Sequence, residues 1–249
     1  MHKLVQGMMR FHDDVFPSQQ DVFQKLIHGQ KPEALFITCS DSRILPHLIT
    51  QTEPGELFIL RNAGNIVPPH GASTGGEAAT IEFAVACLGV RHIIVCGHSH
   101  CGAMKALLKP ETLAGLPATR DWLRHAEATR LLLHGQLEEL NDDERLVCAV
   151  ETNVLVQLDN LRTHPTVAAS LARGQLTLHG CVYQIECGEV LIYTPEQDGF
   201  LPLSQLNTQL LPSRYCAMPS SGAWSAPSNA TTDGFTEPPT PFPPSTQEK

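Results

Sequence analysis

Short, continuous runs of apolar residues alternate along the chain with longer segments whose apolar residues recur every three to four positions. The continuous runs predict buried β-strands at 34–38, 56–61 and 92–97. The recurring pattern predicts helices at 2–15, 19–28, 77–89, from Cys101 onward, at 119–134 and at 143–163. The segment 175–195 predicts two further strands joined at Cys187 and Gly188.

This alternation indicates the fold class. Strands that are apolar throughout are typical of a sheet covered on both faces, and helices between them allow successive strands to run parallel. We therefore expect an α/β fold with a mostly parallel β-sheet of about 4–5 strands flanked by helices. The sequence contains no internal repeat.

The composition changes near residues 205–212, where Pro, Ser and Thr become frequent and the chain ends "FTEPPTPFPPSTQEK". Such a segment buries too little apolar surface to offset the entropy of ordering it. We expect one folded domain over 1–205 and a disordered tail over 206–249. The aromatic residues of the tail are either docking points for a partner or solvated side chains: Tyr215, Trp224, Phe235 and Phe242.

The formal net charge of −9 and the pI of about 5.7 argue against a nucleic-acid partner. No apolar run approaches the roughly 20 residues of a membrane-spanning helix, so no membrane association is expected. The N-terminus has no apolar signal segment. In a chain of 249 residues without an export signal, the eight cysteines favour reduced thiols in a cytosol. Three of them lie in apolar segments and are expected in the core: Cys87, Cys96 and Cys148.

Three residues with metal-binding side chains follow two of the predicted strands. Cys39 ends the first strand in "FITCSDSR", and His98 and Cys101 follow the third in "CGHSHCG". The carboxyl ends of parallel strands are where α/β sheets hold ligands, so these side chains converge if the two strands are neighbours. Two thiolates and one imidazole suit Zn²⁺, and three protein ligands leave a fourth tetrahedral position open, as in catalytic zinc sites.

Other interpretations of these residues stay open. The two thiols could be core residues, or a redox pair, although a redox pair favours the Cys-x-x-Cys spacing that is absent here. His100 offers a further imidazole but is expected to point away from His98. Asp41 and Arg43 follow Cys39. The Asp41 carboxylate could ligate the metal itself and close the site, or a bidentate pair with Arg43 would keep it off the metal and available to water.

With these motifs the chain resembles the β-class carbonic anhydrases over residues 1–200, most of all the cyanobacterial carboxysomal type. The similarity extends over "ITQTEPGELFILRNAGNIVPPHG", "IIVCGHSHCGAMKALLK", "DWLRHAEATR" and "LHGCVYQIECGEVL". The resemblance implies one Zn²⁺ per chain on Cys39, His98 and Cys101, and a catalytic Asp41–Arg43 dyad. It also implies a homodimer, or a higher homo-oligomer, with the N-terminal helices reaching across the dimer.

The resemblance further implies a substrate pocket. Gln30 corresponds to a glutamine whose amide donates to bicarbonate, and Phe58 and Ala63 correspond to residues that line an apolar CO₂ pocket. Phe36 stands where the closable type of the family has a tryptophan, which favours the permanently open type.

Two positions depart from the family pattern. Phe83 replaces a pocket tyrosine and so lacks its hydroxyl group. His70 stands where the carboxysomal type has an aromatic residue, and is either a proton-relay group or an exposed loop histidine.

The resemblance implies reversible hydration of CO₂ to bicarbonate and a proton. The location it implies is cytoplasmic, in a carboxysome, where the enzyme would supply CO₂ to carbon fixation and contact a scaffold protein. The tail lacks the basic, tyrosine-containing segment of several carboxysomal members, which argues against encapsulation. Two alternatives remain: a hydrolase of CS₂ or COS on the same fold, and a catalytically silent protein that binds the carboxysome scaffold.

Overall fold

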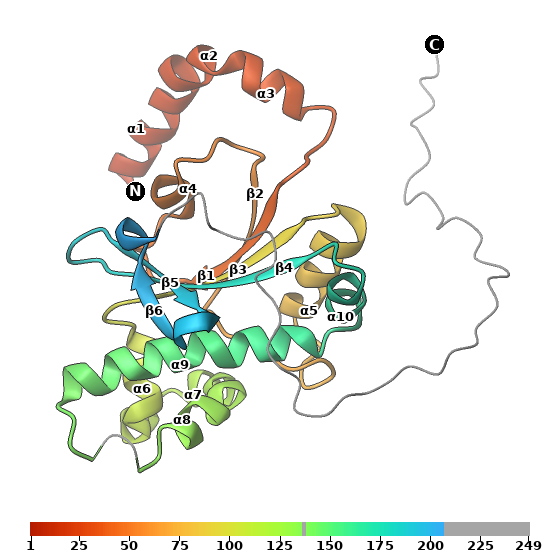
Figure 1. Ribbon diagram of the computed structural model, residues 1–249. Helices are drawn as coiled ribbons and strands as arrows, with labels where there is room; N and C mark the ends of the chain where they lie inside the picture. The colour runs from red at the N-terminus through yellow and green to blue at the C-terminus, as the bar shows by residue number, and fades with distance from the viewer. Residues whose placement is uncertain (136–137, 207–249) are drawn as a thin grey trace, which may run out of the picture. The chain divides into compact units, whose positions relative to one another are not determined.

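The structure is a computed structural model that describes residues 1–135 and 138–206, and its centre is one six-stranded β-sheet (Figure 1). The strands in chain order are β1 (Ala34–Cys39), β2 (Leu57–Asn62), β3 (His92–His98), β4 (Thr177–Tyr183), β5 (Val190–Thr194) and β6 (Gly199–Pro202). Their order in the sheet is β2-β1-β3-β4-β5-β6. The first four run parallel, and β5 and β6 are antiparallel additions.

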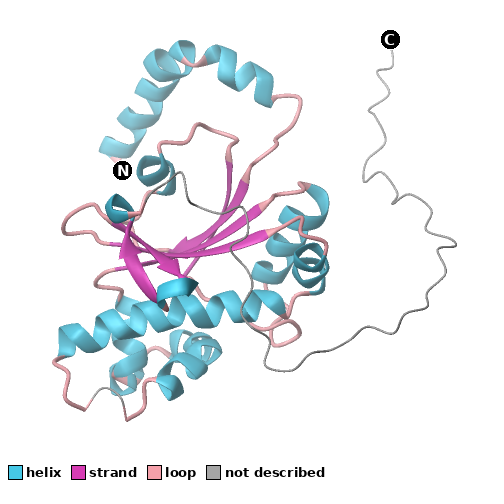
Figure 2. Ribbon diagram, in the orientation of Figure 1, coloured by secondary structure: helices cyan, strands magenta, loops and turns pink. Residues whose placement is uncertain are grey.

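Helices surround this sheet (Figure 2). They are α1 (His2–Arg10), α2 (Phe16–Ser18), α3 (Gln20–Leu26), α4 (Pro46–Thr50), α5 (Gly76–Glu82), α6 (Gly102–Leu108), α7 (Pro117–Leu123), α8 (Glu127–Leu132), α9 (Asp142–Arg162) and α10 (Pro165–Ala172). The predicted fold class, a mostly parallel α/β sheet flanked by helices, is confirmed. The sheet has one more strand than expected because the short β6 pairs with β5 at the edge.

The long helix α9 packs on β3 and β4 (Figure 1). Its start is fixed by a capping box, in which the Asn141 side chain accepts from the backbone N–H of Glu144 and the Glu144 carboxylate accepts from the N–H of Asn141. Glycines in the strands allow the close approach. A Cβ on Gly180 would lie 2.9 Å from Val154 Cγ1 of α9, and one on Gly97 would lie 3.0 Å from the same side chain.

Two expectations about local structure were wrong. The predicted helix 119–134 is divided into α7 and α8 by a 3₁₀ turn at Arg124–Ala126. Since 3₁₀ geometry aligns positions three apart, the turn directs both Leu123 and Ala126 into the core, where they are 2 % and 0 % exposed. Cys87, expected in the core, is exposed. It ends a π-helical turn after α5, and the wider turn rotates it away from the buried side. Cys96 is buried and Cys148 is half-buried.

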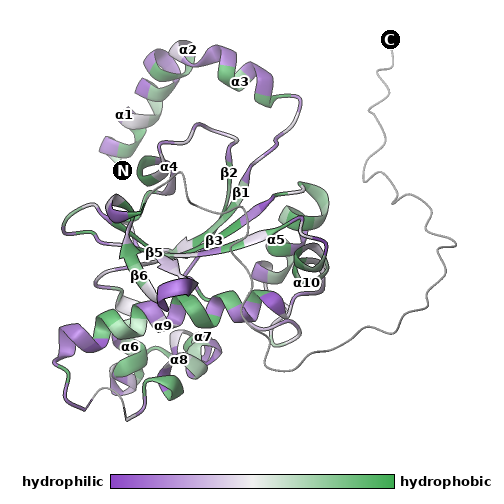
Figure 3. Ribbon diagram, viewed as in Figure 1, coloured by the Kyte–Doolittle hydropathy of each residue, from purple (hydrophilic) through white to green (hydrophobic). Residues whose placement is uncertain are grey.

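The N-terminal helices α1, α2 and α3 contain no buried residue. Large apolar side chains remain exposed on them, including Leu4 at 60 % and Met8 at 68 %. Figure 3 shows the hydrophobic and hydrophilic positions that alternate along these helices. Within the part of the chain that the structure describes, every helix is too short or too polar to cross a membrane. The expected tail lies, from residue 207 onward, outside the described residues.

The strand order places a topological switch point at the centre of the sheet. From β1 the chain continues to β2 on one side, and then crosses to β3 on the other side of β1. Strands β1 and β3 are therefore parallel neighbours, with Thr38 opposite Cys96. In open α/β sheets such a point, at the carboxyl ends of the strands, is where ligands bind.

Candidate metal centre

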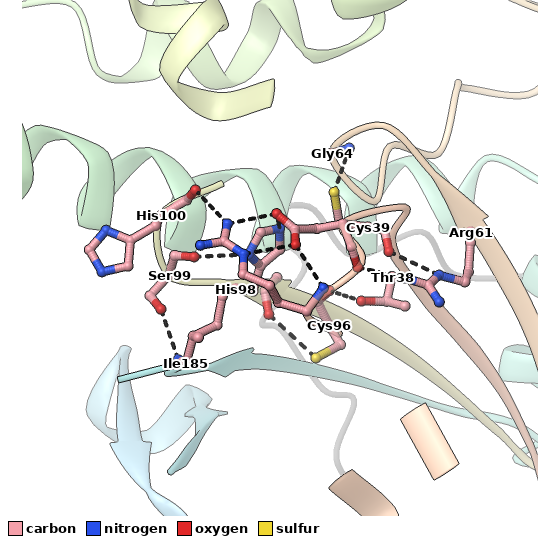
Figure 4. A network of polar contacts seen from close by, with 12 residues as sticks. Thr38, Cys39, Arg61, Gly64, Cys96, His98, Ser99, His100 and Ile185 are labelled. Carbon is pink, nitrogen blue, oxygen red and sulfur yellow. Dashed lines mark hydrogen bonds and ion pairs between the residues drawn. The ribbon is translucent and has the colours of Figure 1, made fainter. Parts of the chain in front are cut away.

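The switch point brings together the three predicted metal ligands. Cys39 is the last residue of β1, His98 is the last residue of β3, and Cys101 precedes α6. One ligand atom from each lies within 4.8 Å of the other two, and all three residues are buried. Figure 4 shows Cys39 and His98 side by side at the ends of their strands. The condition set by the sequence, that the two strands be neighbours, is met.

A contact with the backbone fixes the tautomer of the His98 imidazole. Its Nδ1 lies 2.8 Å from the carbonyl oxygen of Ser99. A carbonyl only accepts hydrogen bonds, so Nδ1 carries the proton and Nε2 of the neutral ring presents a lone pair. This Nε2 is buried and has no hydrogen-bond partner among the described residues. An orphaned buried nitrogen next to two thiols fits a divalent metal ion.

The two thiols differ in their titration because each perturbs the other. The Cys101 side chain lowers the pKa of Cys39, and His98 and the backbone amides of Gly64 and Asp41 act in the same direction. The same contact with Cys39, together with burial, raises the pKa of Cys101. One thiolate and one thiol can thus share the site, and a cation there would favour the loss of the second proton.

Asp41 forms the expected pair with Arg43. Arg43 Nε donates to Asp41 Oδ1 at 2.9 Å, and Nη2 donates to Oδ2 at 2.7 Å. These bonds hold the pKa of Asp41 well below its usual range. The carboxylate is therefore ionised and turned toward the guanidinium, while its Oδ2 lies 3.9 Å from His98 Nε2. Arg61 fixes the same segment by donating to the carbonyls of Cys39 and Asp41.

A loop between β4 and β5 supports the residue after His98, a contact that the sequence analysis missed. Ser99 Oγ donates to Glu186 at 2.6 Å. It also accepts from the backbone N–H of Ile185 at 2.9 Å (Figure 4). His100 has a φ of +56° and directs Nε2 toward Glu186, at 3.7 Å. His100 therefore points away from the predicted ligand set, as expected.

The predicted pocket residues are brought together only in part. The rings of Phe58 and Phe83 lie 6.0 Å apart, with Phe58 half-buried and Phe83 41 % exposed. Ala63 is exposed and follows β2, and Gln30 is exposed in the segment between α3 and β1. The backbone N–H of His70 donates to Thr163 Oγ1, and its imidazole is an exposed loop group.

The loop after β2 contributes a group that no side-chain motif indicates. The backbone N–H of Gly64 points at Cys39 Sγ, 3.4 Å away (Figure 4). Buried amides of α9 hold this loop, among them Asn153 and Gln157, which are 1 % and 0 % exposed. Their spacing of four on a helix otherwise buried through apolar residues was the available signal, because a buried amide needs a polar partner.

Comparisons with known proteins agree with this geometry. A family model described as "Carbonic anhydrase" matches residues 34–190. A carbonic anhydrase of Synechocystis sp. is 48% identical over 89% of this chain and 81% of its own length. One from Pseudomonas aeruginosa is 51% identical over 76% of this chain and 86% of its own length.

Solved structures give the same result. The β-carbonic anhydrase CcaA is similar with a TM-score of 0.80 and 50% identity, over 81% of this chain and 98% of that one. A tetrameric β-carbonic anhydrase from Sordaria macrospora has a TM-score of 0.70 and 32% identity, over 77% of this chain and 95% of that one. The chain belongs to the carbonic anhydrase family, as a β-class enzyme similar to those of cyanobacteria.

Proposed function

We propose that the chain hydrates CO₂ reversibly to bicarbonate and a proton, with one Zn²⁺ per chain held by Cys39, His98 and Cys101. The observation that carries this proposal is the convergence of two sulfurs and the unpartnered His98 Nε2 within 4.8 Å. A Zn²⁺ ion bound there would act as a Lewis acid that brings the pKa of a water molecule toward neutrality.

The residues around the site would orient the reacting water. Asp41 stays ionised because Arg43 holds it, so it can accept a hydrogen bond and direct an oxygen lone pair toward carbon. Asp41 and Arg43 are the proposed catalytic residues. The bidentate pair also keeps the carboxylate directed at the guanidinium, which supports the permanently open type rather than one that Asp41 closes.

We assign the substrate pocket to Phe58, Ala63, Phe83 and Gln30. A neutral, apolar gas is favoured by an apolar surface, which the paired rings of Phe58 and Phe83 provide. Gln30 would supply one amide donor to the bicarbonate oxygen, and a second copy of the chain would complete the pocket.

The test combines metal analysis with rapid kinetics. Cys101→Ser is expected to lose bound zinc and CO₂ hydration together, whereas Cys187→Ser, at an exposed thiol, keeps both. Full zinc and normal turnover in Cys101→Ser would contradict the proposed ligand set. Assaying the same samples for sulfide release from CS₂ and COS separates the related hydrolase chemistry, and wild-type protein without any turnover would indicate a silent binding protein.

We further propose a homodimer, or a larger homo-oligomer, assembled through the N-terminal helices. Leu4, Met8, Phe11 and Val15 recur at helical spacing and are 60 %, 68 %, 46 % and 41 % exposed, an apolar stripe that a second copy would cover. Met8→Glu is expected to give monomers in analytical ultracentrifugation, and Gln6→Glu, on the opposite side of α1, is the matched control. Unchanged assembly of Met8→Glu would exclude this surface.

From the resemblance to the carboxysomal type we also propose a cytoplasmic location in a carboxysome and contact with a scaffold protein, with the domain 1–205 as the enzyme. The similarity to a carbonic anhydrase of Synechocystis sp. supports a cyanobacterial type of enzyme, and the role of the tail 206–249 is decided by the experiment. The test is co-sedimentation of the full chain, and of a chain ending at residue 205, with purified carboxysomes. Recovery of the full chain alone supports the role of the tail, and recovery of neither excludes the carboxysomal role.

A further inference from the structure

The peptide group between Ala63 and Gly64 is held from both sides. Its N–H donates to Cys39 Sγ at 3.4 Å, and its C=O accepts from the indole Nε1 of Trp122 at 2.8 Å. The two contacts lie at opposite ends of one planar unit, so an indole on α7 sets the direction of the N–H that meets the sulfur.

The next peptide group is held in the same way by α9. Asn153 Nδ2 donates to the carbonyl of Gly64 at 3.0 Å. The orientation of that amide is fixed, because its Oδ1 accepts from Gln157 Nε2 at 2.9 Å and from Thr129 Oγ1 at 3.3 Å. Gln157 in turn must present its Oε1 to the backbone N–H of Val67, 2.8 Å away. Reversal of any one amide would break several bonds in this buried chain of donors and acceptors.

Gly64 is a necessary part of this arrangement. Its φ of +82° favours glycine, and a Cβ there would lie 3.0 Å from Ala103 Cβ and 3.2 Å from Met104 Cε of α6. The backbone thus passes close to the segment that follows Cys101. Only the absence of a side chain lets the amide reach Cys39.

We infer that Trp122 and Asn153 are positioning residues for the metal site, which act by aiming the Gly64 N–H at the Cys39 sulfur. This inference rests on the proposed zinc site. A hydrogen bond to a metal-bound thiolate withdraws electron density from the sulfur, so the thiolate donates less charge to the metal. The Asp41 amide also lowers the pKa of Cys39, and the variants below leave it in place.

The test uses Co²⁺-substituted protein, since the energy of the sulfur-to-cobalt charge-transfer band reports on the sulfur lone pair. Trp122→Phe keeps an aromatic ring but removes the donor, so the band is expected to move to longer wavelength. Affinity for zinc, measured by competition with a chelator, is expected to fall by about 10-fold, which is the lower end of the loss seen when a hydrogen-bond partner of a metal ligand is removed. Asn153→Leu removes the hydrogen bond to the carbonyl of Gly64, and it is expected to shift the band in the same direction.

Leu123→Ala is the control for general loosening, because Leu123 is buried, follows Trp122 on α7, and has an apolar side chain that cannot hydrogen-bond to the peptide groups of Gly64. Leu123→Ala should lower the melting temperature and leave the band unchanged. An unchanged band in folded Trp122→Phe, or an equal shift in Leu123→Ala, would overturn the inference. The spectroscopic readout does not depend on CO₂ turnover, so failure of the proposed reaction would be seen separately.

Discussion

The Arg43 guanidinium donates hydrogen bonds to both carboxylate oxygens of Asp41, at 2.9 Å and 2.7 Å. The backbone N–H of Arg43 donates a third bond to Asp41 Oδ1 at 3.0 Å. A third residue contributes through the carbonyl of His100, which accepts from Arg43 Nη2 at 3.3 Å. The guanidinium therefore links the segment after β1 to the segment after β3. The first prediction follows from this geometry.

Arg43→Lys is expected to retain bound zinc but to lose roughly 10²-fold in kcat/KM for CO₂. A lysine ammonium has the charge but not the planar fork that holds both carboxylate oxygens. Stopped-flow hydration and metal analysis on one preparation measure the two quantities. Arg120→Lys, in an exposed ion pair, is the control, and wild-type kcat/KM in Arg43→Lys would show that bidentate geometry is not required.

Ser99→Ala should accelerate the release of zinc. The Ser99 hydroxyl accepts a hydrogen bond from the backbone N–H of Ile185 and donates one to the Glu186 carboxylate. The backbone carbonyl of Ser99 accepts a hydrogen bond from His98 Nδ1. We expect a loss of zinc affinity of about 10-fold or more. Transfer of zinc to a chromophoric chelator gives the rate, and Ser204→Ala, at an exposed serine bonded to Glu189, is the matched control. Equal rates in the two variants would contradict this role.

The His92–His179 pair predicts an acid-sensitive stability. Burial, and then the neighbouring His92, lower the pKa of His179 from 6.5 to about 4, and the two rings share a hydrogen bond of 3.1 Å. In the unfolded chain His179 takes up a proton near pH 6.5, whereas in the folded chain it takes up this proton only near pH 4. The free energy of unfolding is thus intact above pH 6.5 and decreases as pH falls toward 4, by at most about 1.4 kcal/mol per pH unit.

Urea titrations at several pH values measure this slope. His179→Gln is expected to flatten it between pH 6.5 and 4, and exposed His12→Gln is expected to leave it unchanged. Any titration of the metal ligands is common to both variants, so their difference isolates His179. An identical slope in wild type and His179→Gln would disprove the assignment.

Gly180→Ala should destabilise the fold by about 1–3 kcal/mol, because the added methyl would meet Val154 Cγ1 at 2.9 Å and Leu158 Cδ1 at 3.1 Å. Gly115→Ala is the control, because an added Cβ there has no neighbour within 4 Å among the described residues. If the clash is the cause, Val154→Ala in the same chain should recover part of the loss, and a double-mutant cycle by urea denaturation would show the coupling. Strict additivity would rule out the clash.

The main features of the site could be predicted from the sequence because they follow from local patterns. Continuous apolar runs identified β1 and β3, and the rule that ligands gather at the carboxyl ends of parallel strands placed Cys39 beside His98. The Asp41–Arg43 pair was predictable because the two residues are only two positions apart.

The contacts that support the site could not be predicted in this way, since they join residues far apart in the chain. Trp122 reaches a carbonyl 59 positions away, and Asn153 reaches one 89 positions away. A backbone amide such as that of Gly64 carries no side-chain signature. The division of 119–134 into two helices likewise depends on which side chains the core accepts.

The proposed metal ligands Cys39 and Cys101 are 62 positions apart (101 minus 39) and belong to different segments of the fold. An unfolded chain cannot close so long a loop around an ion without a large loss of entropy. With zinc bound at the proposed site, metal occupancy and folding would be linked in one equilibrium, so zinc starvation would also lower the fraction of chains that survive proteolysis.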